Sequence, residues 1–381
     1  MRTVFVSAAA FAVILPVFAA PTTNVPISKF AGRIKANSYI IKLKDGVSKD
    51  AHINKLITAL TAEGKVQYQY GEVFQGYSAN LQGKDLDLIR QSSDVDYIAE
   101  DGMLSIDYEQ GDETAAFVPE SRLAKALKTG GDGAGVDVYG LDSGIYINHS
   151  CFGGRARWGA TFGDYASRDG HGHGTRFPDT AATAVGAKYG VATKANIIAV
   201  KVLSDALRGA NSDIIAGINW AYKQARSSGR PSVVNMSLGG DADAALDSAV
   251  RKAIDGGLHF SISAGNSNID ANRISPARVP SANTVGAVDP KNLKASFSNY
   301  GSVLDVWAPG VNILSAWIGG TTRTNTMSGT SMAAPRVAGY IAVRIGKSND
   351  TPAISSALKA SARTVVTGAP SGTTNLLAQP F

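Results

Sequence analysis

Apolar residues in the carboxyl-terminal two thirds of the chain fall into short continuous runs that alternate with segments of helical periodicity. The runs of strand length lie at residues 136–141, 197–203, 232–237, 258–264, 284–288 and 303–307. After the second run, Ile214, Ile215 and Ile218 share one helix face, and we expect Ser212 to cap this helix. Near-continuous apolar strands that alternate with amphipathic helices predict an α/β fold, a doubly wound parallel sheet with helices on both faces.

Residues 38–101 show a different pattern. Strand-like runs at 38–43, 66–70, 77–81 and 95–99 enclose two segments of helical spacing, at 53–60 and 86–89. The order β-α-β-β-α-β is that of a small ferredoxin-like α+β unit. A polar stretch at 107–135, rich in glycine towards its end, follows and is typical of a linker.

The first 19 residues have the pattern of a secretory signal peptide. Arg2 supplies a minimal basic start, residues 4–17 are mostly apolar, and we expect processing after Ala19. The alternative, a membrane anchor, is disfavoured because the apolar run is short and is interrupted by Pro16. No second run of about 18 apolar residues follows, so we expect a secreted protein that has no membrane association once the signal is removed.

Composition narrows the class of protein further. The chain has 381 residues, 44% of them hydrophobic, which suffices for one large and one small domain. The formal net charge is +6, but no run of basic residues gathers it, so nothing indicates a nucleic-acid partner. Cys151 is the only cysteine, which excludes an intrachain disulfide.

Candidate chemistry centres on Ser331, which lies in the stretch SGTSMAAP at the start of a predicted helix. A serine at this place often only caps the helix, and this is the alternative interpretation. However, a helix N-terminus stabilises negative charge, and the upstream stretches LDSG and HGHGT supply Asp142 and His173. A serine nucleophile needs a base, the base needs an orienting carboxylate, and the oxyanion needs a donor such as Asn266 in SAGN.

The order of these residues separates families of hydrolases. An α/β-hydrolase has its histidine after the serine, but no histidine follows Ser331, and the GxSxG motif is absent. The order Asp142, His173, Ser331 is the one known for subtilisin. Taken singly, Asp142 could cap a loop, Asn266 could occupy a turn, and His171 with His173 could bind a metal. Taken together, these residue types fit one catalytic group.

The chain resembles the subtilisin family of serine proteases, of the proteinase K type, and in particular the secreted fungal members that carry an inhibitory propeptide. The resemblance rests on the strings VYGLDSGI, DGHGHGT, YGVATKANIIAVKVL, NMSLGG, SAGN, SFSNYGSVLDVWAPG and SGTSMAAP, which span most of residues 136–343. It implies a triad of Asp142, His173 and Ser331, with Asn266 as the oxyanion donor.

The resemblance also implies where substrate would bind. An extended peptide would lie between two edges, and a pocket for large apolar side chains would give a broad specificity. The first edge is Ser237, Leu238 and Gly239, the second is Leu207, Arg208 and Gly209, and the pocket walls are Ser263, Ala264 and Gly265. Members of the family usually have glycine-serine-glycine at the second edge, so Leu207 and Arg208 leave the subsite preference there open.

No cofactor is implied for catalysis, but a structural calcium ion is. The carbonyls of Pro280 and Ala282 and the carboxylate of Asp305 would hold it, since calcium prefers oxygen ligands. The alternative is an aspartate at a strand end with no ion.

For the whole chain, the resemblance implies a signal peptide at 1–19, a propeptide at 20–115 that contains the 38–101 unit, and a peptidase domain at 116–381. We expect a secreted serine endopeptidase, made as a self-processing zymogen and inhibited by its own propeptide. It would be a monomer that acts on proteins and peptides, with a part in virulence. Sequons at Asn148 and Asn349 predict glycosylation, whereas the sequon at Asn235 lies in a predicted core strand.

One segment departs from the family. Members have a second histidine and small residues after HGT, whereas residues 176–183 read RFPDTAAT. A proline inside a helix removes a hydrogen bond and clashes with the preceding turn. We therefore expect the helix to restart at Pro178 and to leave His173 on a loosened loop. The alternative to an active protease is a catalytically impaired relative or an imperfect gene model.

Overall fold

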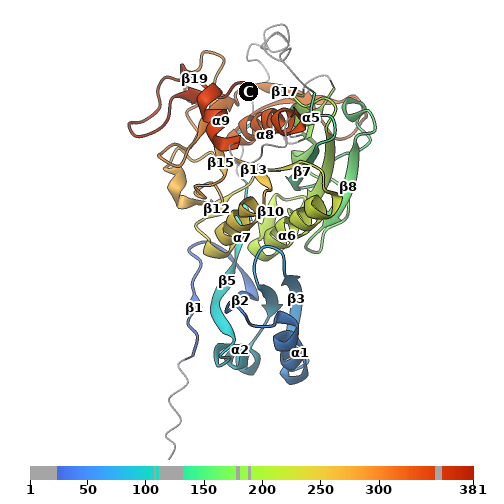
Figure 1. Cartoon of the computed structure of the whole chain (residues 1–381), viewed down its shortest axis with the longest axis vertical. Helices are drawn as coiled ribbons and strands as arrows, with labels where there is room; N and C mark the ends of the chain where they lie inside the picture. Colours follow the sequence, from blue (N-terminus) through green and yellow to red (C-terminus); the bar gives the residue numbers. More distant parts are fainter. Residues whose placement is uncertain (1–23, 107–108, 111–131, 177–180, 188–189, 348–353) are drawn as a thin grey trace, which may run out of the picture.

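The computed structural model describes residues 24–106, 109–110, 132–176, 181–187, 190–347 and 354–381. Figure 1 shows two parts, an amino-terminal unit that ends with strand β5 (Val95–Ser105) and a larger domain that packs against it. The signal peptide expected at residues 1–19 lies outside the described residues.

The larger domain is built on a nine-stranded sheet. In spatial order its strands are β19 (Arg363–Thr364), β20 (Leu376–Leu377), β16 (Val306–Pro309), β15 (Asn283–Val288), β13 (His259–Ser263), β11 (Ser232–Met236), β7 (Asp137–Asp142), β9 (Asn196–Lys201) and β8 (Ala156–Thr161). Neighbouring strands are parallel, except for the pair β19 and β20. The six strands expected from the apolar runs are all present in this sheet.

Helices cover both faces of the sheet, because successive residues of each buried strand point to opposite sides. Val138 packs in one apolar cluster with helices of one face, and Tyr139 packs in a second cluster with helices of the other. The first face carries α5 (Thr183–Val185), α8 (Thr330–Lys347) and α9 (Ile354–Ser361), and the second carries α6 (Asn211–Ser228) and α7 (Ala244–Asp255). The predicted doubly wound α/β fold is confirmed.

The amino-terminal unit has the predicted ferredoxin-like order of elements. These are β1 (Ile27–Ser28), β2 (Ile34–Leu43), α1 (Lys49–Ala59), β3 (Lys65–Tyr70), β4 (Gly76–Asn80), α2 (Gly83–Arg90) and β5. Ile41 of β2, Leu56 of α1 and Ile98 of β5 meet in an apolar core that belongs to this unit alone. The unit is longer than the expected 38–101, because β2 begins at Ile34 and β5 continues to Ser105.

In the part of the chain that the structure describes, six short strands complete the larger domain, and some of them connect it to the amino-terminal unit. They are β6 (Glu109–Gln110), β10 (Arg208–Ala210), β12 (Gly240–Asp241), β14 (Ile274–Ser275), β17 (Ile313–Ala316) and β18 (Thr324–Ser328). The end of β5 lies antiparallel to β10, with Met103 opposite Ala210 and Ser105 opposite Arg208. The amino-terminal unit therefore adds a strand to an edge of the larger domain.

Helix α6 is the second contact between the two parts. The side-chain oxygen of Asn219 accepts the backbone N–H groups of Gly71, Glu72 and Val73, at 3.2, 2.9 and 3.3 Å. The hydroxyl of Tyr70 donates to the Ser212 carbonyl at 3.0 Å. Helix α6 thus binds both the end of β3 and the turn that follows it.

The N-terminus of α6 is capped from the amino-terminal unit. The predicted cap, Ser212, is wrong, because the cap position is held by Ala210, whose side chain cannot accept a hydrogen bond. Instead Asp101 accepts the Ser212 N–H at 2.9 Å and the Ser212 hydroxyl at 2.6 Å, and it also binds Ser38. A carboxylate at this place satisfies an open helix N–H and interacts favourably with the helix dipole.

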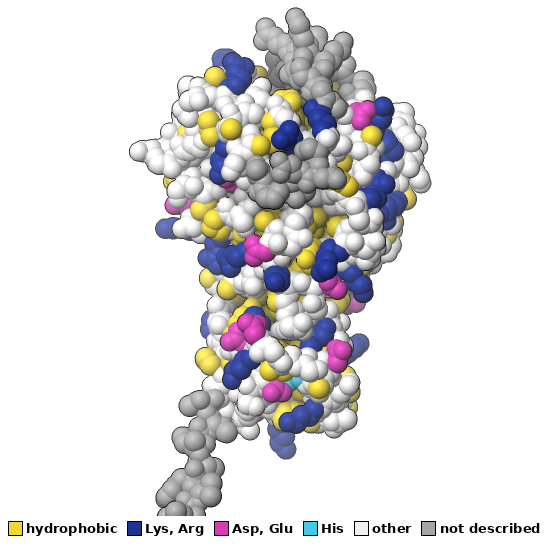
Figure 2. Space-filling view, in the orientation of Figure 1, with side chains coloured by type: hydrophobic (Ala, Val, Ile, Leu, Met, Phe, Trp, Pro, Cys, Tyr) yellow, Lys and Arg dark blue, Asp and Glu magenta, His cyan; other side chains and the backbone are white. Residues whose placement is uncertain are grey.

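Charge is dispersed over the surface. On the face seen in Figure 2, Lys and Arg side chains are scattered among other residues and do not form one patch, which agrees with the absence of basic runs in the sequence. Among the described residues, no helix is both long enough and apolar enough to cross a membrane.

Asp101→Ala should weaken the binding of a separately supplied amino-terminal unit, residues 20–110, to the larger domain by roughly 10- to 100-fold. Hydrogen bonds to a charged group contribute about 1.5–3 kcal/mol. Asp101 is buried, so its removal would leave its donors, Ser212 and Ser38, without this acceptor. Dissociation constants of the two purified parts provide the measurement. Asp45→Ala is the matched control, because the Asp45 side chain is 98% exposed. Equal affinity of the Asp101 variant and the wild type would contradict the capping role.

Candidate functional site

Asp142 and His173 form a buried pair at the carboxyl edge of the sheet. Asp142 is the last residue of β7, and His173 is the first residue of helix α4 (His173–Arg176). The Nδ1 atom of His173 lies 2.7 Å from Oδ1 of Asp142, and both side chains are almost completely shielded from solvent. A hydrogen bond is stronger in such an environment, so the carboxylate fixes the orientation of the imidazole. The structure brings these two predicted residues together.

The prediction that His173 lies on a loosened loop is wrong. His173 starts a helical turn, is 1% exposed and is bonded to Asp142. Helical backbone is present again at residues 181–185. Residues 177–180, including the predicted restart at Pro178, lie outside the described residues.

Ser331 and Asn266 meet at the start of α8. Ser331 is the second residue of this helix, and its Oγ lies 3.4 Å from the Ser237 carbonyl. The side-chain oxygen of Asn266 accepts the backbone N–H and the hydroxyl of Thr330, both at 2.8 Å. This fixes the orientation of the Asn266 amide beside a helix N-terminus, where negative charge is stabilised.

A cavity of about 260 Å³ adjoins Ser331. Its lining includes most residues predicted for substrate binding on this side of the site, Ser237, Leu238, Gly239, Ser263 and Gly265, together with the predicted oxyanion donor Asn266. The prediction for Ala264 is wrong, because this residue does not line the cavity but is buried in the apolar cluster around Trp307. The first predicted edge and two of the three predicted pocket walls thus share one cavity with Ser331.

The amino-terminal unit occupies the second predicted edge. Gly209 and Arg208 pair with the end of β5, and the Leu207 carbonyl accepts the N–H of Ile106 at 3.1 Å. Leu207 itself is buried and adopts a left-handed backbone, with φ of 56°. Beyond residues 107–108, β6 lies antiparallel to β18, and β18 ends three residues before Ser331. The chain is therefore held along the site both before and after residues 107–108.

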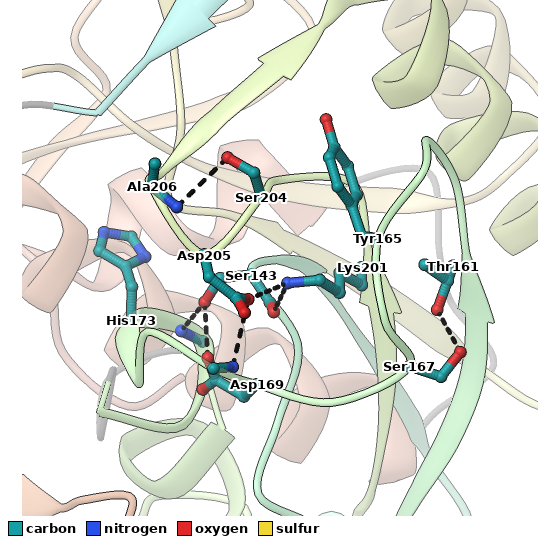
Figure 3. Close-up of polar contacts among 12 residues, drawn as sticks. Ser143, Thr161, Tyr165, Ser167, Asp169, His173, Lys201, Ser204, Asp205 and Ala206 are labelled. Carbon is teal, nitrogen blue, oxygen red and sulfur yellow. Dashed lines mark hydrogen bonds and ion pairs between the residues drawn. The ribbon is translucent and has the colours of Figure 1, made fainter.

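A polar cluster lies near His173, as Figure 3 shows. It includes Ser143, Asp169, Lys201 and Asp205, none of which sequence reasoning assigned a role. Asp169 begins the stretch DGHGHGT, four residues before His173. Its place in this motif was the signal that could have pointed to a role. Thr330, which orients Asn266, was also missed, although it precedes Ser331 directly.

Comparisons with known proteins agree with this geometry. Residues 133–375 match the subtilase family, and residues 38–107 match the family described as peptidase inhibitor I9. The chain is 38% identical to "Subtilisin-like serine protease AsES" of Sarocladium strictum, with 96% of each chain covered. The chain belongs to the subtilase family. It is also 40% identical to "Proteinase R" of Parengyodontium album, with 83% of this chain and 81% of that one covered.

A solved structure supports the fold of this subtilase. The crystal structure of a cold-adapted subtilisin-like serine proteinase shares 43% identity with it at a TM-score of 0.61, and covers 66% of this chain and 90% of that one. As a subtilase the chain is a serine endopeptidase, a hydrolase. Its amino-terminal unit is an inhibitor-type propeptide, so the protein is made as a zymogen.

The residues expected to hold calcium do not fit that ion. Asp305 Oδ1 lies 2.9 Å from the ammonium group of Lys359, and its Oδ2 accepts the Thr284 N–H at 2.9 Å. Both carboxylate oxygens that the ion would need are therefore bound by donors, and Lys359 supplies a positive charge in place of a metal. Pro280 and Ala282 contribute only carbonyls to the expected set. Within the described residues, no group of three or more His, Cys, Asp or Glu side chains could hold a metal ion, His171 and His173 included.

Two further sites can be located. Asn148, a predicted glycosylation site, is exposed, whereas Asn349 lies outside the described residues. Cys151 is 7% exposed, and burial raises the pKa of its thiol to about 12, so the reactive thiolate hardly forms near neutral pH.

The protein should have the same melting temperature, within about 1 °C, with added calcium and with a chelator, because Lys359 already neutralises Asp305. Thermal unfolding of the full chain, carrying Ser331→Ala to prevent self-digestion, is the measurement. An increase in melting temperature with calcium that disappears in Asp305→Asn would show that the ion does displace Lys359.

Proposed function

We propose that this subtilase is a secreted, self-processing endopeptidase that hydrolyses peptide bonds through Asp142, His173 and Ser331. The observation that carries the proposal is the 2.7 Å contact between His173 and Asp142, buried at the same sheet edge as the N-terminus of the Ser331 helix. A buried carboxylate on Nδ1 leaves Nε2 as the nitrogen that exchanges a proton with the nucleophile.

In the proposed reaction, Ser331 Oγ attacks the substrate carbonyl carbon while His173 Nε2 accepts the hydroxyl proton. Asp142 stabilises the imidazolium that forms. The oxyanion accepts hydrogen bonds from the Asn266 amide and the Ser331 backbone N–H, at the positive end of α8. His173 then gives the proton to the leaving amine, the C–N bond breaks, and a water molecule hydrolyses the acyl-enzyme by the same steps.

Substrate is proposed to bind as the propeptide strand does. The end of β5 pairs with β10 through backbone hydrogen bonds, a mode of recognition that depends little on side chains and so supports a broad specificity. Leu104 of that strand is 1% exposed, and a Cβ atom added at Gly240 would collide with its side chain. Gly240 therefore makes room for a large apolar side chain. Ser263 and Gly265 remain the proposed walls of the main specificity pocket.

Self-processing is proposed to cut between Ile106 and Glu109. Ile106 lies in the cavity beside Ser331, and Glu109 pairs with Ser328, so these residues flank the nucleophile. This position lies ahead of the propeptide boundary expected at residue 115. After the cut, the propeptide would remain as an inhibitor until it is degraded.

The proposed setting is extracellular. The signal-peptide pattern at residues 1–19 and the exposed Asn148 sequon support secretion, and we expect a monomer that digests host or environmental proteins. Among the relatives is the "Cuticle-degrading protease" of Metarhizium anisopliae, 37% identical over 91% of this chain and 90% of that one. Virulence stays a prediction. The impaired relative or imperfect gene model remains the alternative, but the buried pair of His173 and Asp142 favours activity.

Ser331→Ala should abolish both self-processing and peptide hydrolysis, with a loss of turnover on the order of 10⁶, the value known for subtilisin itself. Mass spectrometry of the secreted protein is the measurement. Wild type should give a mature N-terminus between Asp107 and Glu109, and Ser331→Ala should keep the propeptide attached. A mature N-terminus at residue 116 would support the boundary expected from the sequence. Folded wild type with no cut at all would support the impaired alternative.

Ser105→Asp in a separately supplied propeptide should strengthen inhibition about two- to fivefold, and Ser105→Lys should weaken it. Ser105 lies directly opposite Arg208, whose exposed side chain makes no ion pair in the described part of the chain, and an exposed ion pair contributes about 0.2–1 kcal/mol. Inhibition constants at low and high salt are the measurement, since salt screens such a pair. The difference between Asp and Lys should vanish in Arg208→Ser enzyme; if it persists there, Arg208 does not set this preference.

A further inference from the structure

The carboxylate of Asp169 bonds to the segment that carries Ser143 and to the segment that carries His173, and Figure 3 shows these three residues. One oxygen, Oδ1, accepts the Ser143 hydroxyl at 3.0 Å and the Gly172 N–H at 2.7 Å. The other, Oδ2, accepts the Thr175 N–H at 2.6 Å. Ser143 follows Asp142 directly, and Gly172 and Thr175 stand on either side of His173. One carboxylate therefore joins the neighbours of both members of the pair.

Ser143 completes the connection from its own side. Its backbone N–H donates to Asp142 Oδ1 at 2.6 Å, and its hydroxyl oxygen accepts the Gly174 N–H at 2.8 Å. The side chain is fully buried. Ser143 thus contacts the catalytic carboxylate with one group and the backbone next to His173 with another.

An outer layer holds this arrangement in place. Lys201 is 1% exposed, and its ammonium donates to the Ser143 carbonyl at 2.5 Å and to Asp205 Oδ1 at 2.8 Å. The same oxygen of Asp205 accepts the Gly170 N–H at 3.2 Å, and Gly170 follows Asp169. The contacts form a closed ring from Ser143 through Asp169, Gly170, Asp205 and Lys201 back to Ser143.

The two segments also meet directly. The Tyr146 N–H donates to the Thr175 hydroxyl, and Asp169 accepts the Thr175 N–H, one of the N–H groups that the first turn of a helix leaves open. The backbones approach closely as well, since a Cβ atom added at Gly174 would collide with the Gly144 carbonyl. Small displacements of Asp169 would therefore be passed on to His173.

We infer that Asp169 is a positioning residue for the catalytic pair: it sets the distance between Asp142 and His173 and does not touch substrate. This inference rests on the proposed function of that pair. A misplacement of about 1 Å at a catalytic group reduces the rate on the order of 10²-fold. The loss should fall on turnover and leave the Michaelis constant unchanged, because no substrate contact is removed.

The test compares Asp169→Ala and Asp169→Asn in the full chain. The first-order rate of self-processing is measured, followed by kcat and KM of the matured protein on a peptide. Asp169→Ala should lower the processing rate and kcat by about 10- to 100-fold, with KM within about twofold. Asp169→Asn should lose less, since its amide oxygen still accepts from Ser143 and Gly172 while the bond to Thr175 is lost.

Asp289→Ala is the matched control. Asp289 is a half-buried loop aspartate that accepts the N–H groups of Lys291 and Leu293, at 2.8 and 2.9 Å, and is not among the contacts of Asp142 or His173. Its removal should leave kcat unchanged. A kcat of Asp169→Ala within twofold of wild type, a loss that appears in KM alone, or an equal loss in the control would overturn the inference.

Folding is monitored separately by the melting temperature of each variant in a Ser331→Ala chain. If Asp169→Ala does not fold, the turnover of Ser143→Ala is measured in its place, because this variant removes the hydroxyl that links Asp169 to Gly174. Turnover of Ser143→Ala equal to wild type would overturn the inference, and a loss of about 10-fold at unchanged KM would support it. The proposed function fails if the Ser331→Ala chain still processes itself or if the folded wild type is not cut at all, and both results are distinguishable from a failure of the inference.

Discussion

The hydrogen bond between His173 and Asp142 is the constraint on which the rest of this subtilase depends. It joins the end of β7 to the start of α4 at 2.7 Å, and both side chains are almost completely shielded from solvent. A buried carboxylate is costly unless its partners are well placed, so the surrounding structure has to hold both ends still. The parallel sheet does this for Asp142, since β7 is flanked on both sides by β11 and β9. For His173, the hydrogen bonds of Asp169 and Ser143 hold the backbone on either side of the histidine.

The propeptide uses the same features of the fold that a substrate would use. Its last strand completes the edge at β10, and the chain then continues past Ser331 to pair with β18. Asp101 supplies a cap to α6 that the peptidase domain does not provide from its own sequence. A sheet of parallel strands contains many contacts between distant parts of the chain and forms slowly. A propeptide that binds one edge strand and one helix end would favour the folded arrangement and block the site with the same contacts.

Two charged side chains lie where the resemblance implied a metal ion or left the subsite preference open. Lys359 provides the positive charge beside Asp305 where the family resemblance implied an ion, so a side chain of α9 ties a strand end to the C-terminal part of the domain. Arg208 places an exposed charge on the edge strand β10, which pairs with the propeptide. Both residues lie outside the segments that carry Asp142 and His173.

The sequence by itself determined the architecture and the chemical groups. Apolar runs and helical periodicity are local signals, and they predicted the six central strands and the ferredoxin-like propeptide unit. The motif order identified Asp142, His173 and Ser331. Only the tertiary structure decided how distant segments satisfy one another. The cap of α6 comes from Asp101, 111 residues away in the sequence, Lys359 reaches Asp305 from another element, and Ala264 packs into the core and not the pocket. The sequence also suggested a loosened His173, because local propensity was the only guide at Pro178. Asp142 and Ser143, whose hydrogen bonds help to hold this histidine, come from a segment 31 residues away, so no local pattern contains those contacts.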